Sequence, residues 1–536
     1  MAIILVAIVV MGPELIFGLT VTDNYRFNLL WPEQFGEVFR SYHAYPRWLP
    51  RAWEGLGAPT FYFYPPFFFW VVSAVDAMAG GALGPERFVP VGTTIILATS
   101  GLSMRAWLRS LANERAALVG AIVYMIAPYH LYDIYCRGAL TEAAAYASVP
   151  LVMLALARLG EGRHRYIPVL AASYAILLLT HLPTALSVSV LLIPSYVVRT
   201  ALRAERPVAF IASASGGGIL GILLAAVYLV PALTLLPFVN ADALNQGFYH
   251  PDSWFFWRTP PGPMGGRMLF IIPATLGAAF FAAGAIIARK NASSYFWPVL
   301  TLLIVLLVAG LFPPFWKFPG LSLVQFPWRA LLIVEFATVT MLATLRWRMA
   351  GPIPLAALPV LAFAYVLLGM MALYTIKRTI NEQTLTAYQL RQGYLDAPEY
   401  TPRGVRIHNA DDPDRVRVEL SNAPLASAAD PRAALQVSEA PDGGMAVAIE
   451  SPGATLVKLR RHYFPHWRVH DTQDRELQVF PDSRDRIVTF LAPAGRSLLR
   501  LEHGSAPHEK LGQALSALAL LLLGLTLLWS SRTEKP

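Results

Sequence analysis

Four segments of the sequence carry side chains that could do chemistry, and the first of them offers a single carboxylate. Asp23 follows directly on an apolar stretch, in LTVTDNYRFNLLW. A carboxylate at the end of a membrane helix can accept a proton from a hydroxyl group as a general base. Aspartate is also common in turns, because its side chain bonds to nearby backbone amides. Asp23 is therefore predicted as a general base, and a turn aspartate is the alternative.

The second segment, residues 129–146, groups two acids and one arginine in YHLYDIYCRGALTEAAAY. Arg137 could pair bidentately with a phosphate group, and Asp133 and Glu142 lie close to it in sequence. Glu142 also begins an apolar helix, where an acid favours the positive helix end. The pattern fits a phosphate site and a structural ion pair equally well.

The third segment is LLLTHLPTAL, which holds His181 at a tight turn between two apolar stretches. A histidine there can donate a hydrogen bond to a phosphate or bind a metal. A histidine that only satisfies a helix end is an equally good interpretation.

The fourth segment, residues 312–330, places three polar side chains among aromatics, in FPPFWKFPGLSLVQFPWRA. Lys317, Gln325 and Arg329 suit a sugar or a phosphorylated headgroup, although aromatics also serve as plain interfacial anchors. Glu335 follows within the next apolar stretch. Carboxylates inside a membrane are costly and usually face a cavity or a partner, so its role is open.

These segments are separated by apolar stretches that must position them. The chain has 536 residues, of which 55% are hydrophobic and 14% are charged, against about 25% charged in soluble proteins. The apolar blocks are long enough to cross about 30 Å of hydrocarbon as helices. The sequence predicts a polytopic α-helical membrane protein with about 12 spans, at 1–20, 88–104, 116–132, 142–157, 166–181, 182–198, 207–237, 268–288, 293–312, 329–345, 353–376 and 511–529.

The basic residues indicate the orientation of these spans. With both termini in the cytoplasm, every short inner loop contains arginine or lysine, as the positive-inside rule requires. The net charge of +9 is then an orientation signal, and no nucleic-acid partner is predicted. The aromatic stretch 61–81 must not span for this topology to hold, so it is predicted as a re-entrant or interfacial segment on the outer face. The first 20 residues lack a basic start and a cleavage site and are predicted as a retained helix.

Residues 377–508 read as a separate, β-rich unit outside the cytoplasm. Short alternating segments suggest an antiparallel sandwich, at 416–420, 433–440, 445–450, 454–459, 475–480, 486–492 and 497–503. The predicted domains are a membrane domain at 1–376, this insert at 377–508, and a last span with a short tail at 509–536. The single cysteine, Cys136, excludes an intrachain disulfide. No metal-ligand spacing or phosphate-cradling glycine loop is present in the sequence.

Several of these segments together resemble the GT-C class of membrane glycosyltransferases. The resemblance rests on the acid after the first helix, on YPRWLPRAWEGLGAPTFYFYPPFFFW and on YCRGALTEAAAYASVP, LLLTHLPTAL, LVQFPWRALL and YFPHW. More narrowly, they resemble the membrane proteins labelled 6-pyruvoyl-tetrahydropterin-synthase-related and their YfhO-like relatives. The chain departs from that group where Tyr25 and Asn28 stand near Asp23 in place of a histidine, and where His466 replaces a glycine.

The resemblance implies a GT-C-like fold and a glycosyltransferase that uses a polyprenyl-phosphate sugar donor at the outer face of the inner membrane. Asp23 takes the place of the family's first-loop acid and acts as general base. Arg137, His181 and Arg329 are expected to hold the phosphate. The remaining substrate-binding candidates orient these groups or line the lipid and sugar site, and they are Asp133, Glu142, Lys317, Gln325, Tyr64 and Trp48.

Other functions fit the same sequence. A lipid or glycan transporter or flippase would explain the many helices, and a non-catalytic scaffold of a polysaccharide pathway would explain the outer loops. The expected partners of the enzyme are the lipid-linked donor, membrane lipid and a glycan, lipid or protein acceptor. The sequence leaves open the sugar, the acceptor, a divalent metal ion, the oligomeric state and the role of the β-rich domain.

Overall fold

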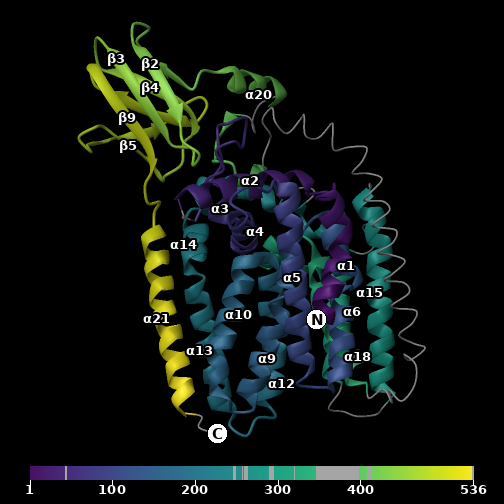
Figure 1. The fold of residues 1–536 in the computed structure, drawn as a ribbon. Coiled ribbons are helices and arrows are strands. Elements are labelled where there is room, and N and C mark those ends of the chain that lie inside the picture. The colour runs from purple at the N-terminus through teal and green to yellow at the C-terminus, as the bar shows by residue number, and fades with distance from the viewer. Residues whose placement is uncertain are drawn as a thin grey trace.

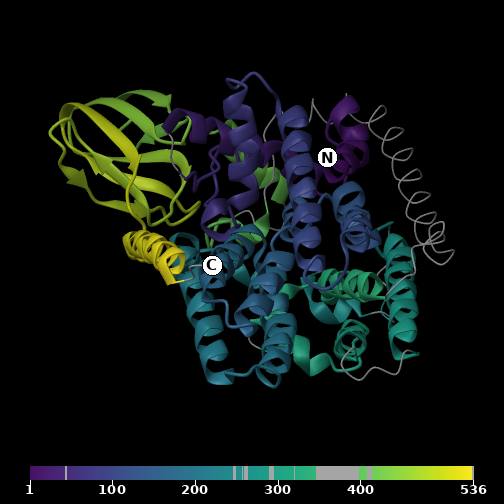
Figure 2. The same ribbon diagram turned by 60° about the horizontal axis from the view of Figure 1, so that its bottom comes forward.

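The computed structural model describes residues 1–42, 45–245, 249–255, 258, 263–288, 295–318, 320–345, 397–406 and 413–533. In this part of the chain, an upright bundle of helices carries a β-rich domain at one end and off to one side (Figures 1 and 2). The helices of the bundle include α1 (Ala2–Phe17), α5 (Pro85–Leu108), α6 (Glu114–Met125), α9 (Val149–Gly160), α10 (Ile167–Thr180), α12 (Ile193–Ala201), α13 (Pro207–Leu224), α14 (Ala226–Thr234), α15 (Pro263–Ile287), α16 (Phe296–Val308), α18 (Leu331–Thr344) and α21 (Glu509–Thr533).

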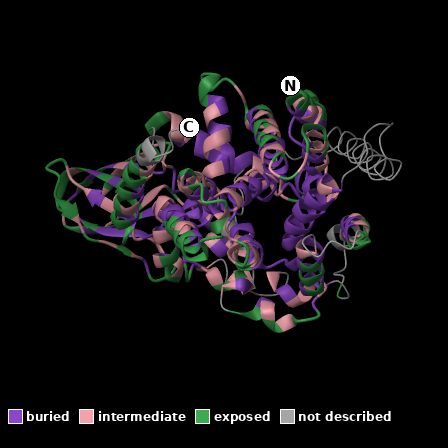
Figure 3. Cartoon of the chain, turned by 90° about the horizontal axis from the view of Figure 1, so that it is seen from below, coloured by how far each residue is buried: buried purple, intermediate pink, exposed green. Residues whose placement is uncertain are grey.

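The helices of the bundle make this a multi-pass membrane protein. In the described residues, six helices are long and apolar enough to cross a membrane. Buried residues gather at the centre of the bundle and exposed ones lie at its rim (Figure 3). The span around α18 is 89% buried and that of α21 only 17%, so α18 is an interior helix. The exposed face of α21 carries Leu520, Leu521 and Leu525, as a lipid-facing helix should. The full count of about 12 spans stays a prediction.

Prolines break several of the predicted spans into shorter helices. The span predicted at 116–132 consists of α6 followed by α7 (Pro128–Tyr132), and the span at 142–157 consists of α8 (Leu140–Ala145) followed by α9. Each second helix has a proline in its first turn, where the missing amide costs nothing. The predicted span at 353–376 and the start of the insert, 377–396, lie outside the described residues.

The aromatic stretch 61–81 forms two short helices, α3 (Thr60–Phe63) and α4 (Phe67–Met78). With 12 residues, α4 is about 18 Å long, too short for about 30 Å of hydrocarbon. It lies along α2 (Tyr25–Tyr42). The Trp31 ring of α2 contacts Phe69 near the start of α4, and Arg40 near the end of α2 pairs with Asp76 near the end of α4. Its length and packing therefore agree with the prediction that this stretch does not span.

The β-rich domain is a sandwich of two antiparallel sheets. One sheet has the order β1-β4-β8-β7 and the other β2-β3-β9-β5-β6. The core between them is apolar and includes Val447, Leu459 and Phe490. The strands are β1 (Ala426–Ala428), β2 (Ala434–Glu439), β3 (Met445–Ser451), β4 (Thr455–His462), β5 (Trp467–His470), β6 (Glu476–Leu477), β7 (Val479–Pro481), β8 (Ile487–Ala492) and β9 (Gly495–His503).

One predicted strand is wrong. Residues 416–420 belong to a helix, α20 (Pro413–Asn422). Val416 and Leu420 are buried, whereas Val418 is 51% exposed. The apolar residues therefore follow the four-residue spacing of a helix face, and Pro413 stands at the helix start, where proline is favoured. Residues 475–480 divide into β6 and β7, which lie in different sheets.

The sandwich is docked on the segment between α2 and α3. Arg461 is buried, and its Nη1 donates to the carbonyl oxygens of Pro50 (2.9 Å) and Gly55 (2.8 Å). The Trp48 ring lies 5.2 Å from the Trp467 ring and is 1% exposed. Two motifs that are far apart in the sequence, residues 45–58 and YFPHW at 463–467, thus form one interface.

His466 in this interface predicts a pH-dependent stability. Burial lowers its pKa well below the ordinary value of 6.5, and neither ring nitrogen has a hydrogen-bond partner in the described part of the chain. The unfolded state therefore binds more protons at acid pH, so stability is lost as the pH falls below about 6.5. Thermal unfolding of the sandwich should shift to lower temperature between about pH 7.5 and 5.5. His466→Phe should flatten this dependence, whereas His508→Gln on the exposed linker should not; an unchanged slope in His466→Phe would refute the assignment.

Candidate functional site

The site is built at the end of α7, where the chain makes one π-helical turn, η1 (Asp133–Arg137), before α8 begins. Nη1 of Arg137 lies 2.6 Å from Oδ1 of Asp133 and 2.9 Å from Oε2 of Glu142. The side chains of all three residues are at most 4% exposed. The structure thus brings together the two acids and the arginine of the second sequence segment.

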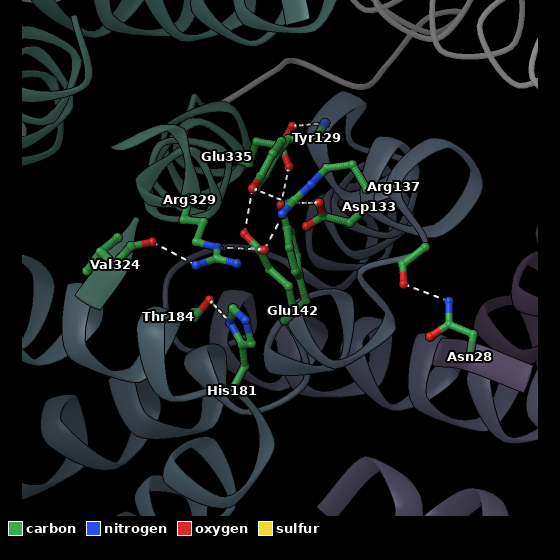
Figure 4. A network of polar contacts seen from close by, with 12 residues as sticks. Asn28, Tyr129, Asp133, Arg137, Glu142, His181, Thr184, Val324, Arg329 and Glu335 are labelled. Atoms are coloured by element: carbon green, nitrogen blue, oxygen red, sulfur yellow. Dashed lines mark hydrogen bonds and ion pairs between the residues drawn. The ribbon is translucent and has the colours of Figure 1, made fainter. Parts of the chain in front are cut away.

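Glu142 is the hub of this group (Figure 4). Its carboxylate accepts hydrogen bonds from Arg137, from Nε of Arg329 at 3.2 Å and from the Tyr129 hydroxyl at 2.5 Å. We call these residues the ionic cluster: Tyr129, Asp133, Arg137, Glu142 and Arg329. The cluster sets two guanidinium groups against two carboxyl groups, so buried charges can compensate one another.

Arg329 enters the cluster from η10 (Pro327–Ala330) and is held by the preceding turn. Its Nη1 donates to the Val324 carbonyl oxygen at 2.7 Å and to Oε1 of Gln325 at 3.0 Å. The guanidinium carbons of Arg329 and Arg137 lie 4.8 Å and 5.8 Å from the centre of the Phe326 ring. One aromatic ring therefore flanks both arginines and fixes the space between them.

Both arginines keep donors that the cluster does not use. All hydrogen bonds that Arg137 makes within the described residues use Nη1, and those of Arg329 use Nε and Nη1. A guanidinium carries five N–H donors in a planar fork that matches a phosphate group. The Nη2 groups of the two arginines are thus the donors that an anionic ligand could take up.

Asp23 lies on the segment that runs beside η1. Its backbone amide donates to the Cys136 carbonyl oxygen at 3.1 Å, and the backbone amide of Asn24 donates to the Arg137 carbonyl oxygen at 2.9 Å. Asn28 fixes the same contact through a 2.7 Å bond from Nδ2 to the Gly138 carbonyl oxygen. Gly138 has φ +64°, and a Cβ atom there would lie 2.1 Å from Oγ1 of Thr22, so the close approach of the two segments requires glycine. Asp23 itself is exposed.

Two more predicted residues lie against the cluster. Tyr64 follows α3, and its hydroxyl lies 2.9 Å from Oγ1 of Thr141, the neighbour of Glu142 in sequence. Burial raises the pKa of the Tyr64 phenol, so it stays protonated and can donate. His181 lies close to Glu142 in Figure 4, and its Nδ1 is 2.8 Å from Oγ1 of Thr184.

Two predicted residues lie elsewhere. Lys317 is 54% exposed and pairs with Asp252 at 2.9 Å. Trp48 lies in the interface with the sandwich, against Trp467. Their part in binding substrate stays an untested prediction from the sequence.

Tyr129 is the cluster residue that the sequence analysis missed. Its hydroxyl donates to Glu142 and accepts from Nη1 of Arg137 at 3.1 Å. The signal was its spacing, since Tyr129, Asp133 and Arg137 recur every four residues and so share one helix face.

Within the described residues, no three His, Cys, Asp or Glu side chains are grouped so as to hold a metal ion.

The turn that holds Arg329 is strained, which predicts that glycine and alanine at position 325 differ in their effect on stability. Gln325 has φ +64° and ψ −53°, and Phe326 N–H donates to the Val324 carbonyl oxygen at 2.6 Å, as in a γ-turn. Such a backbone costs about 1–3 kcal/mol for a residue with a Cβ. Gln325→Gly should raise the unfolding temperature relative to Gln325→Ala, while both lose the Arg329 contact. Equal unfolding temperatures for the two variants would show that the turn is unstrained.

No protein-family model matches this sequence, and no curated protein matches it. Among solved structures, it is similar to the archaeal oligosaccharyltransferase AglB from Archaeoglobus fulgidus in complex with an inhibitory peptide and a dolichol-phosphate, with 11% identity, a TM-score of 0.40 and coverage of 78% of this chain and 59% of that one. A second match is ArnT from Cupriavidus metallidurans bound to undecaprenyl phosphate, with 12% identity, a TM-score of 0.39 and coverage of 73% and 72%. The chain thus spans less than two thirds of the length of AglB.

Proposed function

We propose that this chain is a membrane glycosyltransferase that moves a sugar from a polyprenyl-phosphate donor to a glycan, lipid or protein acceptor. The observation that carries the proposal is the backbone pairing of Asp23 with Cys136 and of Asn24 with Arg137. This pairing brings the segment that carries the exposed Asp23 alongside the turn that carries Arg137, whose guanidinium keeps unused donors. A proton acceptor and an anion site are the two parts that this transfer requires.

The proposed reaction needs one base. The acceptor hydroxyl attacks the anomeric carbon of the sugar, and its proton passes to the Asp23 carboxylate. The bond between that carbon and the phosphate oxygen breaks, and the lipid phosphate leaves as an anion. Donors on Nη2 of Arg137 and of Arg329 stabilise the charge that develops on the phosphate. Phosphate is a good leaving group, so the second carboxylate of a glycoside hydrolase is not needed.

The basic loops support an outer location for this chemistry. The turns after α5, α9 and α12 lie at the end of the bundle away from the sandwich (Figure 1), and they contain Arg109, Arg163 and Arg203. With this end in the cytoplasm, as the positive-inside rule favours, Asp23 and the sandwich lie at the outer face of the inner membrane. There, a donor has to arrive on a lipid, because nucleotide sugars are made in the cytoplasm.

The test uses the purified chain in lipid vesicles with a set of radiolabelled undecaprenyl-phosphate sugars and cell-envelope extract as acceptor. The proposal predicts that sugar transferred and undecaprenyl phosphate released appear in equal amounts. Movement of intact donor across the vesicle membrane, with no release of undecaprenyl phosphate, would instead indicate a transporter. Failure to consume or move any donor would contradict both functions.

A further inference from the structure

The intramembrane carboxylate Glu335 lies next to the ionic cluster but does not belong to it. It is 3% exposed and projects from the second turn of α18. Its Oε1 accepts from the backbone amide of Tyr129 at 2.7 Å and from Oγ1 of Thr275 at 3.3 Å, and its Oε2 accepts from the Tyr146 hydroxyl at 2.7 Å. These donors come from three different parts of the chain, so Glu335 ties α18 to α7, to the end of α8 and to α15.

The contact with Tyr129 acts as a helix cap supplied by another helix. The first amides of a helix have no partner within it. At the start of α7, Ala127 has no side chain that could cap and Pro128 has no N–H, so Tyr129 carries the first unpaired amide. A carboxylate is the most favourable partner at this end of a helix. Glu335 therefore fixes where α7 begins.

Tyr129 connects Glu335 to the ionic cluster. The same residue that gives its amide to Glu335 gives its hydroxyl to Glu142 and accepts from Arg137. The turn η1 continues directly from α7, so a shift of α7 moves Asp133 and Arg137 with it. Tyr146, the other hydrogen-bond partner of Glu335, also contacts α7, because its ring stacks on His130 with ring centres 3.7 Å apart. Both contacts of Glu335 thus end on α7, the short helix that continues into the turn with Arg137.

We propose that Glu335 is a positioning residue that sets the Arg137 guanidinium for a lipid phosphate without touching the ligand. The proposal rests on the proposed function for the identity of the anion. The geometric part of the proposal is independent of that function, because the hydrogen bonds of Glu335 to Tyr129 and Tyr146 involve only this chain.

Cys136 offers a direct readout of this order. It is the only cysteine in the chain, it lies within η1 beside Arg137, and it is 8% exposed. The experiment measures the rate at which a maleimide labels Cys136 in Glu335→Ala, in Glu335→Gln and in the unaltered protein. Thr340→Val is the matched control, since Thr340 lies on the same helix, is fully buried and accepts a 3.0 Å bond from Nε1 of Trp107.

Glu335→Ala should be labelled about tenfold faster or more, as expected from losing a hydrogen bond to a charged acceptor. Glu335→Gln should react at nearly the unaltered rate, because the amide oxygen still accepts from Tyr129 and the Tyr146 hydroxyl can accept from the amide nitrogen. An unchanged rate in Glu335→Ala, or an equal increase in Thr340→Val, would overturn the positioning role.

A second arm adds undecaprenyl phosphate before the maleimide. Protection of Cys136 in the unaltered protein that is lost in Glu335→Ala would support the proposal as a whole. If Glu335→Ala alone is labelled faster and undecaprenyl phosphate protects no variant, the order imposed by Glu335 stands and the phosphate site of the proposed function is overturned. Protection that is equal in the unaltered protein and in Glu335→Ala would refute the link between Glu335 and phosphate binding.

Discussion

Asp23→Asn is expected to lower sugar transfer by about 10²- to 10⁴-fold, the usual contribution of a general base. Asparagine keeps the size of the side chain and leaves the backbone bonds to Cys136 and Arg137 in place, but it cannot accept the proton of the acceptor hydroxyl. Binding of the donor should change little, because the proposed function assigns the phosphate to the arginines. The measurement is the rate of undecaprenyl phosphate release in vesicles at saturating donor.

The matched control for this variant is Asp242→Asn. Asp242 is an exposed acid in the segment after α14, where it pairs with Arg403 at 3.0 Å. This surface pair contributes little to stability, and the variant should transfer sugar at the unaltered rate. If Asp23→Asn retains full activity while it inserts and folds normally, Asp23 is a turn residue and another group must be the base.

The second large effect is expected for Arg137→Ala, and it is an effect on stability. Removing this guanidinium leaves Asp133 and Glu142 buried and facing each other without their shared cation. Breaking a buried ion pair on one side costs about 3–5 kcal/mol, so the unfolding temperature should fall clearly. Loss of donor binding in this variant would therefore not by itself identify a ligand contact.

Two further variants test whether the broken ion pair causes the loss of stability in Arg137→Ala. In Arg137→Ala, Glu142 still contacts Arg329, whereas Asp133 loses its cation. Adding Asp133→Asn to Arg137→Ala should therefore restore part of the lost stability. Arg158→Ala is the comparison at a surface pair, since Glu161 lies 2.9 Å away and is 44% exposed, and its cost should stay below about 1 kcal/mol. If Arg137→Ala unfolds at the same temperature as Arg158→Ala, the cluster does not support the fold.

The sequence predicted the apolar helices and the contact between Arg137 and Glu142 because both depend on local spacing. A run of apolar residues marks a membrane helix wherever it packs, and Arg137 and Glu142 are separated by only four residues, so the short connection through Gly138 and Ala139 keeps them close. The breaks at Pro128 and Pro150 were missed because mean hydropathy ignores a proline within an apolar run. The error at Val416–Leu420 has the same origin, since a short apolar pattern fits a strand or a helix face until its flanking residues are considered.

The parts of the site that could not be predicted depend on long-range packing. Arg329 meets Glu142 across 187 positions, and Glu335 meets Tyr129 across 206. Which helices face each other follows from the packing of the whole bundle, and a single sequence does not encode it in any short pattern. The contact of Trp48 with Trp467 is likewise long-range, and it was not predicted from the aromatic motif around Trp48.

The most direct test of the central claim is photocrosslinking with an undecaprenyl phosphate that carries a diazirine next to the phosphate. Peptides around residues 133–146 and 320–330 should be labelled, and excess unlabelled undecaprenyl phosphate should suppress the labelling. Asp23→Asn should be labelled like the unaltered protein, because Asp23 acts on the acceptor. Labelling confined to the outward-facing helices, such as α21, and unaffected by competition would contradict the claim that the ionic cluster binds a lipid phosphate.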